Sequence, residues 1–92
     1  WKDRKVAYIA HIPHMSDSVA LVSAADKMYN ARSIIKDGRE VGQAIWKRFT
    51  GKKEGTLWYY CALMDAFERR KPLPIFKELK LTVEELKAFA NS

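Results

Sequence analysis

Apolar positions recur along most of this 92-residue chain at the three- and four-residue spacing of amphipathic helices. No stretch shows the strict alternation of apolar and polar residues that a half-buried strand needs. The pattern therefore predicts an all-α fold, a helical bundle of about five helices. At this length the chain forms a single helical domain, or a fragment of one, over residues 1–92.

Capping residues, glycines and prolines mark where the predicted helices begin and end. Ser16 or Asp17 caps the second helix, and Gly38 stops it. Thr82 opens a capping box that starts the last helix. The expected helices cover about residues 2–12, 17–36, 39–49, 57–70 and 83–90, with a turn-rich loop at 50–55 and a short turn at 75–79.

The second predicted helix is apolar nearly all round. On a helical wheel its polar side chains share one narrow stripe, and all of them are short, whereas a solvated face usually carries long Lys and Glu side chains. We expect such a helix to be buried, with its polar stripe lining an internal site or a cleft. The stripe consists of Ser23, Asp26, Asn30, Ser33 and Asp37.

Asp26 is the residue on which the role of this stripe depends. A buried carboxylate is costly unless it is paired or bound to a metal ion. Asp26 and Asn30 are four residues apart, so both side chains point the same way and can share one ligand. Two explanations are open: Asp26 forms a structural ion pair with an arginine of another helix, or it belongs to a functional site.

The charge of the chain favours an anionic partner. The formal net charge is +6, which suits a nucleic acid or a phosphorylated small molecule. No helix, however, arrays Arg or Lys with Asn or Gln on one face for reading a nucleic-acid groove. The sequence therefore favours a small phosphorylated ligand over nucleic acid. The basic residues cluster at positions 2–5, 47–53 and 69–71.

The cysteine content and the apolar runs indicate the compartment. Cys61 is the only cysteine, which excludes an internal disulfide and suits a reducing cytosol. No apolar run reaches the roughly 20 residues that cross a bilayer, and no signal-peptide pattern is present. These features predict a cytoplasmic protein without a membrane partner.

Residues 22–32, Val-Ser-Ala-Ala-Asp-Lys-Met-Tyr-Asn-Ala-Arg, resemble the last motif of HD-domain metal-dependent phosphohydrolases. The branch they resemble is that of the RelA/SpoT-type guanosine tetraphosphate (ppGpp) hydrolases, whose pattern is close to Ala-Asp-Lys/Arg-Leu-His-Asn-x-Arg. This chain differs from that pattern at Met28 and Tyr29. The flanking residues 7–11, 46–49 and 55–60 also resemble small HD proteins, so the likeness covers about residues 1–70.

The resemblance implies an HD-domain-like helical bundle and a role for three residues. Asp26 matches the last ligand of a divalent metal ion, for which manganese is the candidate. Asn30 matches a residue beside the nucleotide, and Lys27 matches a basic position near the site, so both are candidate substrate-binding residues. The implied function is metal-dependent hydrolysis of a phosphorylated nucleotide such as ppGpp, at its 3′-pyrophosphate.

The departure from the family pattern matters as much as the match. The first His and the His-Asp pair of the family are absent, and His11 is not their equivalent. We therefore expect the C-terminal part of an HD domain, with too few ligands to hold a catalytic metal, and whether this chain is itself an enzyme stays open. The other function class is a non-enzymatic basic helical module that binds protein or nucleic acid. Apolar surface exposed by missing helices would favour self-association.

Overall fold

The computed structural model describes residues 1–92 and consists of helices without a strand. This confirms the all-α prediction, although four α-helices and two short 3-10 helices replace the expected five helices. In chain order the elements are α1 (Lys2–His11), η1 (Ile12–His14), α2 (Asp17–Val41), η2 (Gly42–Arg48), α3 (Lys52–Arg69) and α4 (Ile75–Ala90).

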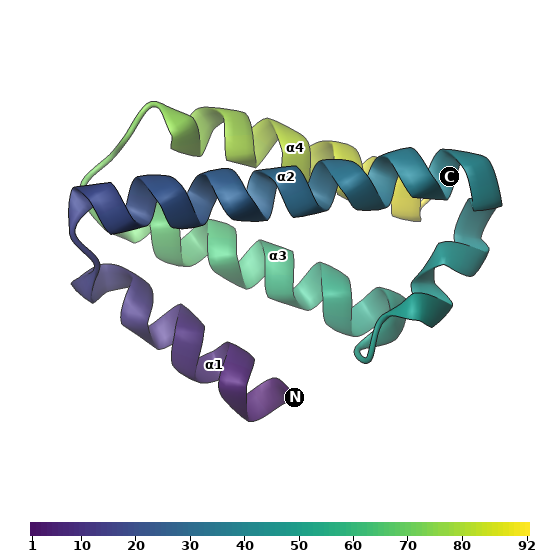
Figure 1. Cartoon of the computed structure of the whole chain (residues 1–92), viewed down its shortest axis with the longest axis horizontal. Helices are drawn as coiled ribbons and strands as arrows, with labels where there is room; N and C mark the ends of the chain where they lie inside the picture. Colours follow the sequence, from purple (N-terminus) through teal and green to yellow (C-terminus); the bar gives the residue numbers. More distant parts are fainter.

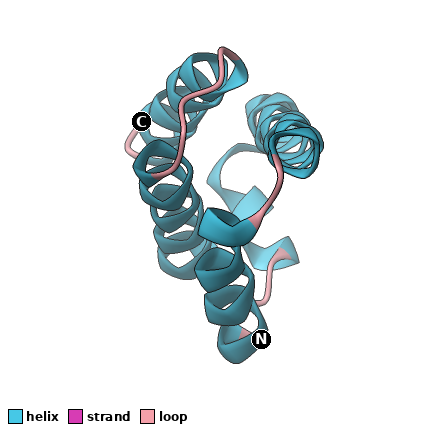
Figure 2. Ribbon diagram, turned by 90° about the vertical axis from the view of Figure 1, so that its left-hand side faces the viewer, coloured by secondary structure: helices cyan, strands magenta, loops and turns pink.

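Helices α2, α3 and α4 form one bundle, and α1 is attached to its side (Figure 1). Helix α4 packs against both α2 and α3, and Arg39 of α2 donates a hydrogen bond of 3.0 Å to Glu85 of α4. Helix α1 diverges from α2 and contacts α3 and η1 instead (Figures 1 and 2). One face of α2 is therefore left without a neighbouring helix.

The apolar core lies between the three bundle helices. Leu63 and Phe67 of α3 and Leu79 and Leu86 of α4 are fully buried. Helix α1, in contrast, has no buried residue. The bundle is thus the stable frame on which α1 is placed. None of the helices combines the length and the apolar content that a membrane crossing requires.

Helix α2 begins as predicted and ends later than predicted. The Ser16 hydroxyl accepts a hydrogen bond of 3.2 Å from the Val19 amide, which confirms the N-cap. Gly38 does not stop the helix. A Cβ there would lie 2.3 Å from the Phe89 ring of α4, so this glycine allows close helix packing. The helix ends at Gly42, whose φ of 71° suits glycine.

The region from η2 into α3 also differs from the prediction. The third predicted helix is the short 3-10 helix η2, and most of the predicted loop at residues 50–55 is the first turn of α3. Thr56, directly before the predicted start of this helix at residue 57, is buried within it. The local turn signals of Gly51 and Gly55 are overridden here by tertiary packing.

Helix α4 is continuous where two elements were expected. The Thr82 hydroxyl donates a hydrogen bond of 2.9 Å to the Glu78 carbonyl, within the helix, and caps nothing. Phe76 and Leu79 precede Thr82 and are buried on the same side as Val83. Their burial extends the helix back to residue 75.

Arg70 links the start of α2 to the end of α3 by hydrogen bonds. Its guanidinium, only 8% exposed, donates from Nη2 to the Met15 carbonyl and to Asp17 Oδ1, both at 3.0 Å. Lys71 Nζ donates to Asp17 Oδ2 at 3.2 Å. The hydrogen bond from Arg70, followed by that from Lys71, holds the pKa of the Asp17 carboxyl below its ordinary value.

Candidate functional site

The Asp26 side chain lies near the surface and is 61% exposed. The prediction that α2 is buried on all sides is therefore wrong, because α1 turns away and leaves one face of α2 open. Val22 and Tyr29 on that face are 69% and 70% exposed. Asp26 is thus not a buried carboxylate whose desolvation demands a partner.

The close polar neighbours of Asp26 belong to its own helix. Asn30 Nδ2 donates to Asp26 Oδ2 at 3.5 Å, and Lys27 Nζ lies 3.6 Å from the same oxygen. The pairing of Asp26 and Asn30 agrees with their predicted four-residue relation. The structure contains no ion pair between Asp26 and an arginine of another helix. Asp17 makes a pair of that kind with Arg70.

The residues around Asp26 do not fit a metal site by themselves. No group of three or more His, Cys, Asp or Glu side chains gathers in the structure. A divalent ion needs several convergent oxygen or nitrogen ligands, and Asp26 supplies one. His11 and His14 are exposed and do not complete a set with it.

Lys27 and Asn30, the two predicted substrate-binding residues, line one cleft of about 290 Å³. The cleft lies among residues of α1, α2, η2 and α3. Lys5 of α1 and Arg48 of η2 bring two further positive charges to it. Three cations from three elements therefore meet around one hollow. Its aromatic walls are Trp1, Phe49, Tyr59 and Tyr60.

The two lysines of this cleft lie over aromatic rings. Lys5 Nζ is 3.9 Å from the centroid of the Tyr59 ring, and Lys27 Nζ is 4.9 Å from that of Tyr8. Burial, followed by the charges of Lys27 and Arg4, lowers the pKa of Lys5. The side chain of Lys27 is only 18% exposed. An anion bound beside the two ammonium groups would relieve their mutual repulsion.

Tyr59 and Tyr60 form the part of the cleft that belongs to α3. Burial raises the pKa of each phenol to about 12. The charge of Asp26 is a smaller cause of both shifts, so this carboxylate acts on the tyrosines from nearby. Both phenols consequently stay neutral and can donate hydrogen bonds at physiological pH.

A second hollow of about 390 Å³ adjoins the cleft and shares Asn30, Arg48 and Tyr60 with it. Ser33 and Asp37 of the predicted stripe line this hollow, and Arg48 Nη1 lies 3.6 Å from Asp37 Oδ2. Asn30, Ser33 and Asp37 of the polar stripe therefore line a cleft, whereas Ser23 and Asp26 do not. The cleft is open at the surface and not internal.

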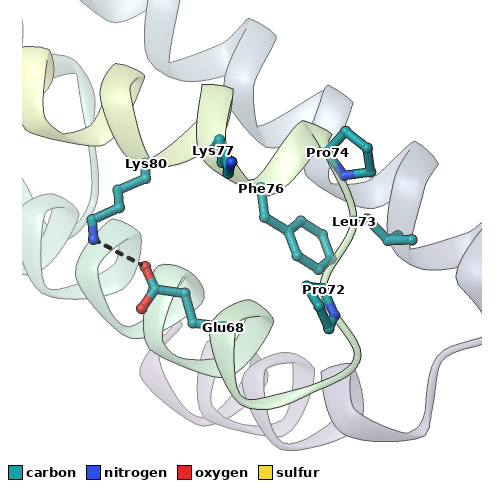
Figure 3. Close-up of a pocket in the computed structure, with 7 residues that line it drawn as sticks. All are labelled: Glu68, Pro72, Leu73, Pro74, Phe76, Lys77 and Lys80. Atoms are coloured by element: carbon teal, nitrogen blue, oxygen red, sulfur yellow. Dashed lines mark ion pairs between the residues drawn. The ribbon is translucent and has the colours of Figure 1, made fainter.

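A larger groove of about 630 Å³ lies where α3 turns into α4 (Figure 3). Pro72, Pro74 and Phe76 give it apolar walls, and Lys80 pairs with Glu68 at 3.8 Å beside it. It contains none of the residues that the sequence singled out. Size alone therefore does not identify the site, and the convergence of charge on the smaller cleft is the better guide.

Lys5, Arg48 and the aromatic walls were not predicted to be parts of one site. Along the sequence the two cations belong to separate basic clusters. Positions 5, 27 and 48 are far apart in the chain and meet only through folding. A local signal was the four-residue spacing of Trp1 and Lys5, which places both on one side of the first helix.

No family model matches this chain, and comparisons with curated proteins and with solved structures return no match. The residues of the cleft and the motif around Asp26 are therefore the features that bear on its function.

Proposed function

We propose that this chain binds a phosphorylated nucleotide in the cleft, as the nucleotide-binding part of an HD-type metal-dependent phosphohydrolase. The observation that carries the proposal is the convergence of Lys5, Lys27 and Arg48 on one hollow, with the amide of Asn30 beside them. Charged donors of this kind make the strongest hydrogen bonds to phosphate oxygens.

The state of Lys5 supports an anionic ligand. Lys5 takes part in none of the ion pairs of the structure, which leaves its ammonium free for a ligand. Burial, followed by the charge of Lys27, disfavours the protonated form of Lys5 and lowers its pKa. A phosphate group would offset both effects. The free protein therefore already holds the Lys5 ammonium where a bound anion would stabilise it.

The shape and the walls of the cleft support a nucleotide in preference to a bare phosphate. The cleft and the adjoining hollow together extend well beyond one phosphate group. Phe49 and Tyr60 line both parts and offer apolar surface to a base or a sugar. Ser33 and Asp37 add polar groups at the far end, where a base can be recognised.

Asp26 is proposed as one ligand of a divalent ion, with manganese as the candidate, on the strength of the resemblance of residues 22–32. This chain supplies no further ligands beside it. We therefore expect the chain to bind the nucleotide without hydrolysing it. Release of pyrophosphate from ppGpp with Mn²⁺, at a rate above that of Asp26→Ala, would contradict this expectation.

Isothermal titration calorimetry with ppGpp tests the binding proposal. We expect Lys27→Gln and Asn30→Ala to weaken binding about tenfold each, as for the loss of one hydrogen bond to a charged group. Lys87→Gln removes a charge from the exposed surface of α4 and is the matched control. Absence of binding, or equal affinity in all variants, would refute the proposal.

The exposed side chains of Val22 and Tyr29 favour a second candidate, a non-enzymatic interaction module. Its partner would be a second copy of the chain, and self-association stays a prediction. Light scattering of the purified protein tests this candidate: a dimer would support it, and a monomer would contradict it.

A further inference from the structure

The indole of Trp1 rests on the first turn of α3, against two glycines. A Cβ atom at Gly51 would lie 2.5 Å from the indole Cη2, and one at Gly55 would lie 3.0 Å from the same atom. Both separations are shorter than an ordinary van der Waals contact, so glycine at these positions leaves room for the ring. We call this seat, formed by Gly51 and Gly55, the glycine notch.

Backbone geometry does not explain these glycines. Gly51 has φ −78° and ψ −5°, which other residues adopt readily. Gly55 lies inside α3 and does not have a positive φ. Glycine within a helix is less favourable than alanine. The contact with Trp1 is common to both positions, and a Cβ at Gly51 would also lie 3.1 Å from the Gly55 Cα.

Trp1 links the glycine notch to the cleft. It lines the cleft together with Lys5, which is one helical turn further along. Lys5 Nζ lies 5.5 Å from the centroid of the Trp1 indole and 3.9 Å from that of the Tyr59 ring. Trp1 is 37% exposed, and Tyr8 and Ile9 pack against the core further along α1. The contact of Trp1 with the glycine notch therefore acts on the first turn of the helix.

We propose that Trp1, seated in the glycine notch, is a positioning residue that holds Lys5 over the cleft for the phosphate groups of the ligand. The inference rests on the proposed function, because its ligand is the phosphorylated nucleotide. Trp1 acts through Lys5. Loss of Trp1 or of the notch therefore has the same effect on binding as loss of Lys5.

Calorimetry with ppGpp measures this effect. Gly51→Ala places a methyl group 2.5 Å from the indole Cη2 and so moves the indole out of the notch, and Trp1→Ala removes the indole without adding any atom. We expect each to weaken binding about tenfold, as for the loss of one charge-assisted contact. In the Lys5→Gln background neither substitution should weaken binding further, because the contact is already absent.

The matched glycine control is Gly38→Ala, whose new methyl group meets Phe89 at the contact between α2 and α4. It should lower the melting temperature and leave the affinity unchanged. Circular dichroism shows whether Gly51→Ala remains helical. If it does not, Trp1→Ala carries the test alone, since it introduces no clash.

A measurement without ligand separates this inference from the proposed function. NMR titration of the Lys5 side chain should give a pKa nearer to the ordinary 10.5 in Gly51→Ala and Trp1→Ala, because the ammonium leaves its partly buried place. An unchanged Lys5 pKa, an unchanged affinity, or an equal loss of affinity in the Lys5→Gln background would overturn the inference. If the wild type binds no ppGpp, the proposed function fails, and this titration still decides whether Trp1 positions Lys5.

Discussion

The bundle side and the cleft side of this molecule differ in what their residues contribute. Between α2, α3 and α4, residues such as Leu63 and Phe67 are fully buried in apolar surroundings. On the other side α1 has no buried residue, and Lys5 is held with a lowered pKa over an aromatic ring. This difference indicates that the bundle residues stabilise the fold. The cleft, in contrast, holds a charged group, Lys5, whose protonated form is disfavoured in the folded state.

The largest effect is expected in the bundle core. Phe67→Ala should lower the free energy of unfolding by about 3–5 kcal/mol, because it removes a fully buried ring and leaves a cavity. Val6→Ala on α1 is the control and should change it by less than about 0.5 kcal/mol, since Val6 is exposed. Urea denaturation measures both values. Similar losses for the two variants would remove the distinction between the two sides.

An intermediate effect is expected where the turn before α2 meets the end of α3. Arg70→Leu should lower the free energy of unfolding by about 2–3 kcal/mol, because the Met15 carbonyl and the Asp17 carboxylate lose a charged donor. The same urea experiment measures it. Lys71→Gln removes the exposed partner of Asp17 and should change stability by less than about 1 kcal/mol. A loss as large for Lys71→Gln would show that net charge, and not the buried guanidinium, holds this junction.

The smallest effect is expected at Lys5, and it has the opposite sign. Burial lowers the pKa of Lys5 in the folded state, so the unfolded chain binds the proton more tightly and folded stability increases with pH. Lys5→Gln should therefore melt slightly above the wild type at pH 7, with a difference that shrinks towards pH 10.5.

Melting temperatures across this pH range measure the difference between Lys5→Gln and the wild type. Lys2→Gln removes the same charge from the same helix outside the cleft and corrects for net charge. A melting temperature of Lys5→Gln below that of Lys2→Gln at pH 7 would mean that Lys5 stabilises the fold. The contrast between the bundle and the cleft would then be wrong.

Much of the fold follows from local patterns in the sequence. The first helix and the Ser16 cap are found as predicted, because three- and four-residue periodicity and N-capping act within one or two turns of chain. The stop at Gly38 and the cap at Thr82 were wrong. Gly38 serves the contact with Phe89 of α4, and no local pattern contains that contact.

Two residues that the sequence singled out, Lys27 and Asn30, line the cleft, because the polar stripe and the motif of residues 22–32 are both local to α2. Their role in substrate binding stays a prediction. The prediction that Asp26 is buried was wrong, because it assumed that α2 has a neighbour on every side. Lys5 and Arg48 join the site from other elements, so their roles could be seen only after folding.

The sequence by itself determined the all-helical fold and the stripe of short polar residues on one helix, because these depend on spacing along the chain. Only the tertiary structure decided which face of α2 stays open, and which cations meet beside Asn30. Those features depend on the angle at which α1 leaves the bundle. That angle is set by contacts between distant residues, among them the contact of Trp1 with Gly51 and Gly55.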